Sequence, residues 1–173
     1  SLPSYTRVGS LKGTQRSHEA GLKYVVFGGV ASGAMLYGFS WLYGMTGSLD
    51  IATIGAALQS GGAQPLTLFL ATVLILVGLG FKVAAVPFHM WCPDVYEGAP
   101  VTVTAFLSVG PKAAGFALIR RIFYGALAQP LGPDLAPGAN LTRPTLIAVL
   151  TAATTFHGNP SALATRNLKA LFL

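Results

Sequence analysis

The sequence predicts an all-α protein, a bundle of helices that crosses a membrane several times and contains one broken helix. Of its 173 residues, 53% are hydrophobic and only 9% are charged, whereas a typical soluble domain carries about 25% charged residues. The apolar residues form uninterrupted runs, and about 20 such residues are enough to cross a bilayer core as a helix. These runs lack the alternation of barrel strands, so helices are the structure that satisfies their backbone in lipid.

The first two membrane spans follow from two long stretches without charge. No charged residue occurs from Tyr24 to Leu49 or from Ile51 to Phe81, and Gly47, Gly61 and Gly62 mark a loop between two spans. The expected spans are 20–44 and 65–90.

The last two spans follow from two further apolar runs. The third run extends from Ala99 to Leu127 and is interrupted by Lys112, Arg120 and Arg121, while the fourth extends from Pro144 to about Ala164. The expected spans are 99–127 and 144–162. Partial spans are expected at each end, so residues 1–173 are interpreted as a single membrane domain that is truncated at both ends.

Loop charges predict the orientation of the chain. The loops at 1–18 and 160–169 are basic, whereas the loops at 45–63 and 128–143 carry almost no basic residue. Because basic loops favour the cytoplasmic side, the two basic loops and the loop that follows the second span are expected there.

Small residues and prolines occur within the apolar runs. Gly29 and Gly33 are spaced for close approach of another helix. Pro87 and Pro111 each remove an amide donor and disturb a helix. Broken helices in transporters often line an ion site, so a functional break and a simple kink both remain open for these prolines.

Lys82 and Lys112, two lysines within apolar runs, are the strongest indication of function in the sequence. At 1.5 Å per residue, Lys112 lies roughly 20 Å into its span and Lys82 roughly 24–27 Å into its own. A lysine placed so deeply costs about 2.5–3.5 kcal/mol or more on insertion scales, and such residues usually mark a path for ions or protons. Burial lowers the pKa of an amine, which makes reversible protonation possible near neutral pH. The alternative, snorkelling toward the membrane surface, suits Lys23, Arg120 and Arg121 better.

His89 is the third candidate for proton translocation. It follows Lys82 by seven residues, which is two turns along one face of an unbroken helix, and histidine can relay protons near neutral pH. His157, toward the end of the fourth span, is ambiguous. Asp94 and Glu97 could bind a metal or transfer protons, but their loop is rich in proline and glycine, which favours solvated carboxylates.

The sequence also excludes several classes of function. The net charge of +6 comes from scattered basic residues, whereas a nucleic-acid interface needs clustered ones. The single cysteine, Cys92, rules out an internal disulfide or a multi-cysteine iron–sulfur site in this segment. Neither a nucleotide-binding nor an HExxH motif is present, so we expect no bound cofactor, no metal and no direct NADH binding in this chain.

Three blocks of sequence carry a resemblance to a known family. They are GFKVAAVPFHMW at 80–91, PDVYEGAP at 93–100 and TAFLSV at 104–109, which leads to Lys112. Together they closely resemble subunit N (subunit 2) of NADH:quinone oxidoreductase, respiratory complex I, an antiporter-like proton-translocating family. Shorter similarities lie at 19–24, 42–47, 158–159 and 167–169. The chain departs from the family at 156–160, where His157 and Pro160 replace apolar residues, and after Lys169, where a second basic residue is usual.

The resemblance implies an antiporter-like fold of which this chain is a central fragment. It implies that Lys82 lies on a broken helix as the pumping lysine, that Lys112 is the connecting lysine of the next helix, and that His89 lies between them. The glutamate that pairs with the pumping lysine in this family lies on the span before Ser1, outside the chain. The fragment alone is therefore not expected to pump.

The expected function is that of a proton-translocating, non-redox subunit in the membrane arm of NADH:quinone oxidoreductase, with electron transfer to quinone in partner subunits. Membrane lipid and other membrane-arm subunits are the expected partners, in the bacterial plasma (inner) membrane. Three alternatives stay open: a subunit of a multi-subunit sodium/proton antiporter, a subunit of a membrane-bound hydrogenase, and a membrane scaffold that transports nothing.

Overall fold

The computed structural model describes residues 2–10, 15–60, 64–127 and 143–164 of the chain. All regular structure in these ranges is helical and none is strand, so the predicted all-α class is confirmed. The elements are α1 (Leu2–Val8), α2 (Gln15–Thr46), α3 (Ile51–Gln59), α4 (Pro65–Val83), α5 (Cys92–Gly98), α6 (Val101–Arg121), a π-helical turn η1 (Ile122–Ala126) and α7 (Arg143–Ala164).

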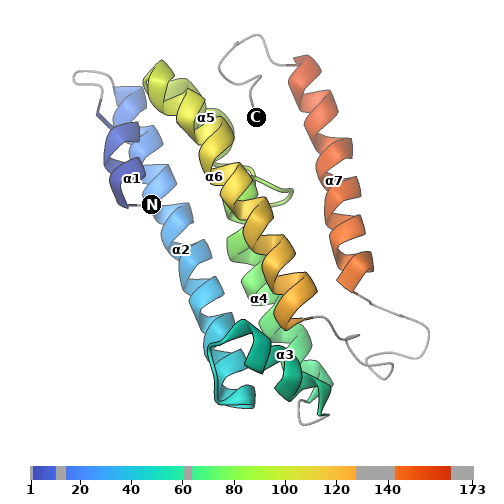
Figure 1. The fold of residues 1–173 in the computed structure, drawn as a ribbon. Helices are drawn as coiled ribbons and strands as arrows, with labels where there is room; N and C mark the ends of the chain where they lie inside the picture. Colours follow the sequence, from blue (N-terminus) through green and yellow to red (C-terminus); the bar gives the residue numbers. More distant parts are fainter. Residues whose placement is uncertain (1, 11–14, 61–63, 128–142, 165–173) are drawn as a thin grey trace.

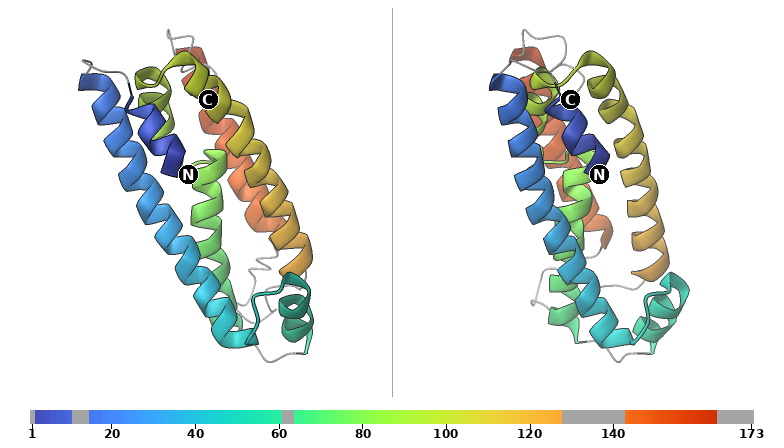
Figure 2. Two further views of the ribbon diagram at one scale, coloured as in Figure 1. Left: turned by 60° about the vertical axis from the view of Figure 1, so that its left-hand side comes forward. Right: turned by 90° about the vertical axis from the view of Figure 1, so that its left-hand side faces the viewer.

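Four long helices lie side by side and alternate in direction (Figure 1). Helix α2 runs from the end that holds α1 and α5 to the end that holds α3. Helix α4 runs back toward the end that holds α1 and α5, α6 runs again toward the end that holds α3, and α7 runs back beside them (Figures 1 and 2). The start of α2, the connection from α4 to α6 and the last turn of α7 therefore share one end of the bundle.

Three of the described helical segments are long and apolar enough to cross a membrane: Gln15–Thr46, Pro65–Val83 and Val101–Gly125. The fourth predicted span coincides with α7, which has 22 residues but is more polar around His157 and Asn159. Large apolar side chains cover the outer faces of these helices, and Val30 and Val109 are 70% and 68% exposed. Exposed surface of this kind suits contact with lipid or with further membrane helices.

Helix α3 corrects one expectation from the sequence. Residues 45–63 were expected to form a loop, but Ile51–Gln59 is helical. Asp50 caps this helix, because its Oδ2 atom accepts hydrogen bonds from the backbone N–H of Thr53 at 3.0 Å and from the Thr53 hydroxyl at 2.9 Å. Ile54 and Leu58 are buried, so a short amphipathic helix closes this end of the bundle.

Replacing Asp50 with alanine should loosen α3. Loss of an N-cap costs about 1 kcal/mol, and this corresponds to about a fivefold rise in the hydrogen-exchange rates of the α3 amides. Exchange measured by mass spectrometry tests this, with Gln59→Ala at the exposed far end of the helix as the control. Unchanged exchange in Asp50→Ala would contradict the capping role.

The same cap gives α3 a dependence on pH. The hydrogen bonds from Thr53 hold the pKa of the Asp50 carboxyl below its usual range. A carboxylate whose folded-state pKa is lowered stabilises the fold above its unfolded pKa, and this contribution is lost as pH falls through the folded value. Protection of the α3 amides, measured relative to the intrinsic exchange rate at each pH, should therefore fall at acid pH in the wild type and change less in Asp50→Ala.

Glycines allow α2 and α4 to approach closely, but they are not the glycines that the sequence singled out. A Cβ atom on Gly38 would lie 2.9 Å from the carbonyl oxygen of Ala71, and one on Gly78 would collide with Met35. By contrast, a Cβ atom on Gly29 or Gly33 would meet nothing within 4 Å among the described residues. The predicted close approach at Gly29 and Gly33 is therefore not made within this part of the chain.

Candidate functional site at the broken helix

Helix α4 ends at Val83, although the predicted span extends to residue 90. Pro87 explains this end, because in a helix its ring would clash with the carbonyl of Val83, four residues earlier. Proline also disfavours helical backbone at the preceding residue, Val86. The chain therefore passes through turns at 84–91, where the Val86–Pro87 peptide is cis, before α5 begins. The broken helix that the sequence predicts is confirmed.

The end of α4 is closed by a Schellman motif. The N–H of Ala85 donates to the carbonyl oxygen of Gly80 at 2.8 Å, and the N–H of Ala84 donates to that of Phe81 at 3.3 Å. These two bonds satisfy carbonyls that a helix end would leave unpaired. Ala84 has a φ of 58°, which is unfavourable for a residue with a side chain. The break is thus a specific turn, held by its own hydrogen bonds.

Lys82 lies in the last turn of α4 and is partly buried. Its backbone faces α6, where a Cβ atom on Gly115 would lie 2.6 Å from Cγ1 of Val83 and 3.5 Å from Cβ of Lys82. Among the described residues, no carboxylate forms an ion pair with Lys82. The carbonyls at the end of a helix favour a nearby positive charge, so the break itself helps to hold the ammonium group.

Lys112 lies one turn before Gly115 on α6 and is also partly buried. Its Nζ atom is 5.9 Å from the centre of the Tyr96 ring of α5, a distance at which a cation is attracted by the ring face. Helix α6 continues through Pro111 without a break, so this proline, unlike Pro87, ends no helix. Lys82 therefore lies at the contact between the end of α4 and the middle of α6, and Lys112 lies one turn from that contact, beside α5.

His89 lies beyond the end of α4, close to α7. The two-turn spacing from Lys82 applies only to an unbroken helix, and α4 has ended before His89. The imidazole instead approaches α7, and its ring centre lies 6.0 Å from that of His157. The Nδ1 atom of His89 is buried without a hydrogen-bond partner among the described residues. Nothing in the spacing of the sequence indicated this pairing, because it depends on where the break directs the chain.

Helix α7 also contacts the backbone of the break. The N–H of Val86 donates to the hydroxyl oxygen of Thr154 at 3.1 Å, and that hydroxyl donates to the carbonyl of Leu150 at 2.7 Å. Sequence reasoning did not single out Thr154. Its hydroxyl satisfies an amide that has left the helix, so α7 helps to define the shape of the turn.

Aromatic rings pack the other side of the break against α2. Trp91 lies 4.8 Å from Tyr24 and 4.8 Å from Phe81 between ring centres, and Tyr24 lies 4.7 Å from Tyr5 of α1. All except Tyr5 are buried. Contacts of this kind contribute about 0.5–1.5 kcal/mol each beyond burial, so Lys82 stands next to a rigid aromatic cluster.

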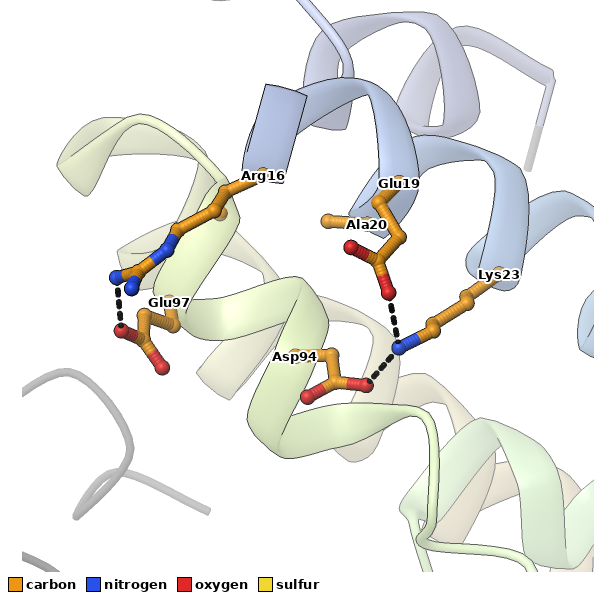
Figure 3. A pocket seen from close by; sticks show the side chains of 7 residues that line it. Arg16, Glu19, Ala20, Lys23, Asp94 and Glu97 are labelled. Carbon is orange, nitrogen blue, oxygen red and sulfur yellow. Dashed lines mark hydrogen bonds and ion pairs between the residues drawn. The ribbon is translucent and has the colours of Figure 1, made fainter. Parts of the chain in front are cut away.

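The carboxylates that follow the break are solvent-exposed, as expected, but they lie on a helix rather than in a loop, and both are ion-paired. Asp94 and Glu97 lie on helix α5, and both face the first turns of α2 (Figure 3). Asp94 accepts from Lys23 at 2.7 Å and Glu97 accepts from Arg16 at 3.1 Å. Glu19 also pairs with Lys23, at 2.7 Å. Helix α2 begins at Gln15, before the expected start of the first membrane span at residue 20.

This ion-paired cluster surrounds a surface pocket of about 260 Å³. Close packing accompanies the pairs, because a Cβ atom on Gly98 would lie 2.6 Å from Cβ of Ala20. Exposed ion pairs of this kind contribute about 0–1 kcal/mol each, so they orient α5 more than they stabilise it. In the described part of the chain, no three His, Cys, Asp or Glu residues are grouped closely enough to hold a metal ion.

Replacing Gly115 with leucine should push α6 away from the end of α4. The added side chain would overlap Val83, and overpacking of this kind costs about 1–3 kcal/mol. The thermal midpoint of the assembled protein in detergent should fall, as should proton transfer if the two lysines serve it. Gly44→Leu is the matched control, since a Cβ atom there meets nothing within 4 Å among the described residues. Equal midpoints for the two variants would show that the contact at Gly115 is unimportant.

Comparison with known proteins supports the family suggested by the sequence. Residues 1–172 match the family described as NADH:quinone oxidoreductase/Mrp antiporter, transmembrane. The chain is 50% identical over 182 aligned positions to an NADH-quinone oxidoreductase subunit N of Anaeromyxobacter sp. (strain Fw109-5), which covers 99% of this chain and 35% of that relative. The chain thus spans about a third of the length of the curated relatives that it matches.

Two solved structures share the fold. A chain of respiratory complex I from Thermus thermophilus with bound aureothin superposes with a TM-score of 0.77 at 36% identity, over 98% of this chain and 33% of that one. A chain of the Mrp complex from Dietzia sp. DQ12-45-1b superposes with a TM-score of 0.80 at 25% identity, over 98% and 30%. Because the family model matches the chain along almost its whole length, the chain belongs to the NADH:quinone oxidoreductase/Mrp antiporter transmembrane family.

Proposed function

We propose that this chain is part of a proton-translocating subunit in the membrane arm of an NADH:quinone oxidoreductase. The observation that carries the proposal is the contact at Gly115, which brings Lys82 at the end of broken helix α4 against α6, one turn from Lys112. Two partly buried amines, one at this contact and one a turn away from it, suit the transfer of a proton from one helix to the next. The similarity to subunit N relatives supports this choice of complex.

The proposed chemistry is proton exchange between neutral and protonated amines. A protonated Lys82 releases its proton to water at the break, the proton passes His89, and neutral Lys112 takes it up. The buried nitrogen atoms His89 Nδ1 and Trp91 Nε1 have no partner among the described residues. Buried polar atoms of this kind are normally hydrogen-bonded to water. A short chain of water molecules at the break would satisfy both nitrogen atoms and could carry the proton.

The proposed subunit carries no cofactor of its own. NADH oxidation and quinone reduction belong in this proposal to partner subunits, and coupling reaches Lys82 and Lys112 through conformational change and through the charges of neighbouring groups. The partners are other membrane-arm subunits and lipid, and the location is the bacterial plasma membrane. Carboxylates on parts of the subunit outside this chain would supply the negative charge that Lys82 lacks here.

The similarity to a chain of an Mrp complex supports a second candidate, a subunit of a sodium/proton antiporter. The two candidates share the same lysines and differ in what drives the protons. An experiment on the whole complex can therefore separate them, because the first requires electron transfer and the second requires a sodium gradient.

The test uses the full-length subunit in its purified complex, reconstituted into proteoliposomes. NADH and quinone should drive proton movement, and a double variant, Lys82→Ala with Lys112→Ala, should lower it strongly. NADH oxidation by a water-soluble electron acceptor, which bypasses the membrane arm, should be unchanged in that variant. Undiminished pumping in the double variant would refute the proposal. Proton exchange that follows an imposed sodium gradient and ignores NADH would favour the antiporter.

A further inference from the structure

Helix α7 meets the break at two points, and one of them is a second histidine. We infer that His157 is a proton-relay residue that exchanges protons between water and His89. This inference rests on the proposed function, because it adds a step to the same proton route. It concerns a residue that the sequence left ambiguous.

The geometry of α7 fixes His157 opposite the break. Thr154 and His157 are three residues apart and so lie on one face of α7. Thr154 accepts the hydrogen bond from Val86 at 3.1 Å, and the His157 ring lies 6.0 Å from that of His89, inclined by 46°. One contact sets the position and rotation of α7 against the turn, and the other places the two imidazoles side by side.

The two imidazoles differ in how far the described residues enclose them. His157 is exposed among the described residues, whereas His89 is partly buried and its Nδ1 atom is enclosed without a partner. A pair with one exposed and one enclosed member can carry protons between the outside and the break. A structural ring pair would not need titratable nitrogens in both rings.

The transfer itself needs only the two rings and water. His157 binds a proton from bulk water on one ring nitrogen and releases the proton of its other nitrogen toward His89, directly or through a water molecule. His89 then passes a proton on toward Lys112, the acceptor of the proposed route, and both imidazoles return to the neutral form. No bond other than N–H and O–H bonds forms or breaks, and no electrons are transferred. Two adjacent positive rings would repel each other, so the pair carries one proton at a time.

The experiment replaces His157 in the full-length subunit of the reconstituted complex. His157→Phe keeps an aromatic ring but removes both nitrogens, and His157→Ala leaves space for an added base. A positioned proton-transfer group contributes about 10²–10⁴-fold to the step that it serves. Transfer at the break should then become rate-limiting, and NADH-driven pumping should fall by about tenfold or more in both variants. His18→Phe, which removes an exposed histidine from the start of α2, is the control.

Chemical rescue separates a relay from a packing role. Imidazole added to the His157→Ala complex should restore pumping, whereas pyrazole, a ring of the same shape but a much weaker base, should not. Full pumping in His157→Phe would overturn the inference, and so would a loss in His157→Ala that imidazole fails to restore. If the phenylalanine variant does not assemble, the alanine variant with imidazole answers the same question.

A third variant distinguishes failure of this inference from failure of the proposed function. Lys82→Met measured in the same preparation should pump poorly whether or not His157 is a relay. If Lys82→Met loses pumping and the His157 variants do not, the relay is refuted and the proposed function stands. If Lys82→Met pumps fully, the proposed function itself is refuted.

Discussion

Proton pumping should be almost abolished when Lys82 is replaced by methionine in the assembled complex. Methionine fills a similar volume at the end of α4 and keeps the contact with Gly115, but it cannot bind a proton. Loss of a positioned proton-transfer group costs about 10²–10⁴-fold in the step that it serves. The measurement is the initial rate of NADH-driven acidification of proteoliposomes, normalised to the amount of assembled complex.

Lys82→Arg separates proton transfer from a need for positive charge alone. Arginine stays charged at all relevant pH values, so it can preserve an electrostatic role but cannot release a proton. We expect Lys82→Arg to fail as Lys82→Met does. Normal pumping in the arginine variant would show that Lys82 supplies only a fixed charge. Lys23→Met is the control, since that amine takes part in exposed ion pairs at the end of the bundle.

Lys112→Met should produce the second largest loss. The variant leaves Lys82 able to take up a proton but removes the acceptor on α6, so a proton at the break has no next site. Pumping should fall by about 10²-fold, and electron transfer to quinone should slow with it if the two are coupled. Electron transfer to a water-soluble acceptor should remain.

The control for Lys112 lies on the same helix. Arg120→Met also removes a cation from α6, but Arg120 is exposed and lies two turns beyond Lys112. It should leave pumping close to that of the wild type. If both variants lose pumping equally, the effect reflects the charge of α6 rather than a site at Lys112.

The sequence predicted the features that depend on composition and on single residues. Long apolar runs define α2, α4 and α6, and Pro87 predicts the break because the effect of a proline on a helix is local. Lys82 and Lys112 stand out because a cation within an apolar run is costly wherever the chain folds. Their roles in proton transfer are still predictions.

Features that depend on packing could not be predicted in the same way. The pairing of His89 with His157 joins segments far apart in sequence, through a turn whose direction no spacing rule gives. The same holds for Thr154, which satisfies an amide that the break exposes. Helix α3 was missed because its nine residues are too few for a membrane span. Gly29 and Gly33 have the spacing for close approach, but other glycines of α2 and α4 make the contacts.

The contact at Gly115 also restricts how the bundle can move during turnover. A Cβ atom on Gly115 would lie only 2.6 Å from Cγ1 of Val83, so the two helices cannot come much nearer, and their relative movement has to be separation, axial sliding or rotation. Phe81, next to Lys82, stacks on Tyr24 of α2 with ring centres 6.0 Å apart, so a displacement of α6 alone would move Lys112 relative to Lys82. Pairs of spin labels on α2 and α6 would register it as a change in separation of up to about 5.4 Å, the rise of one helical turn.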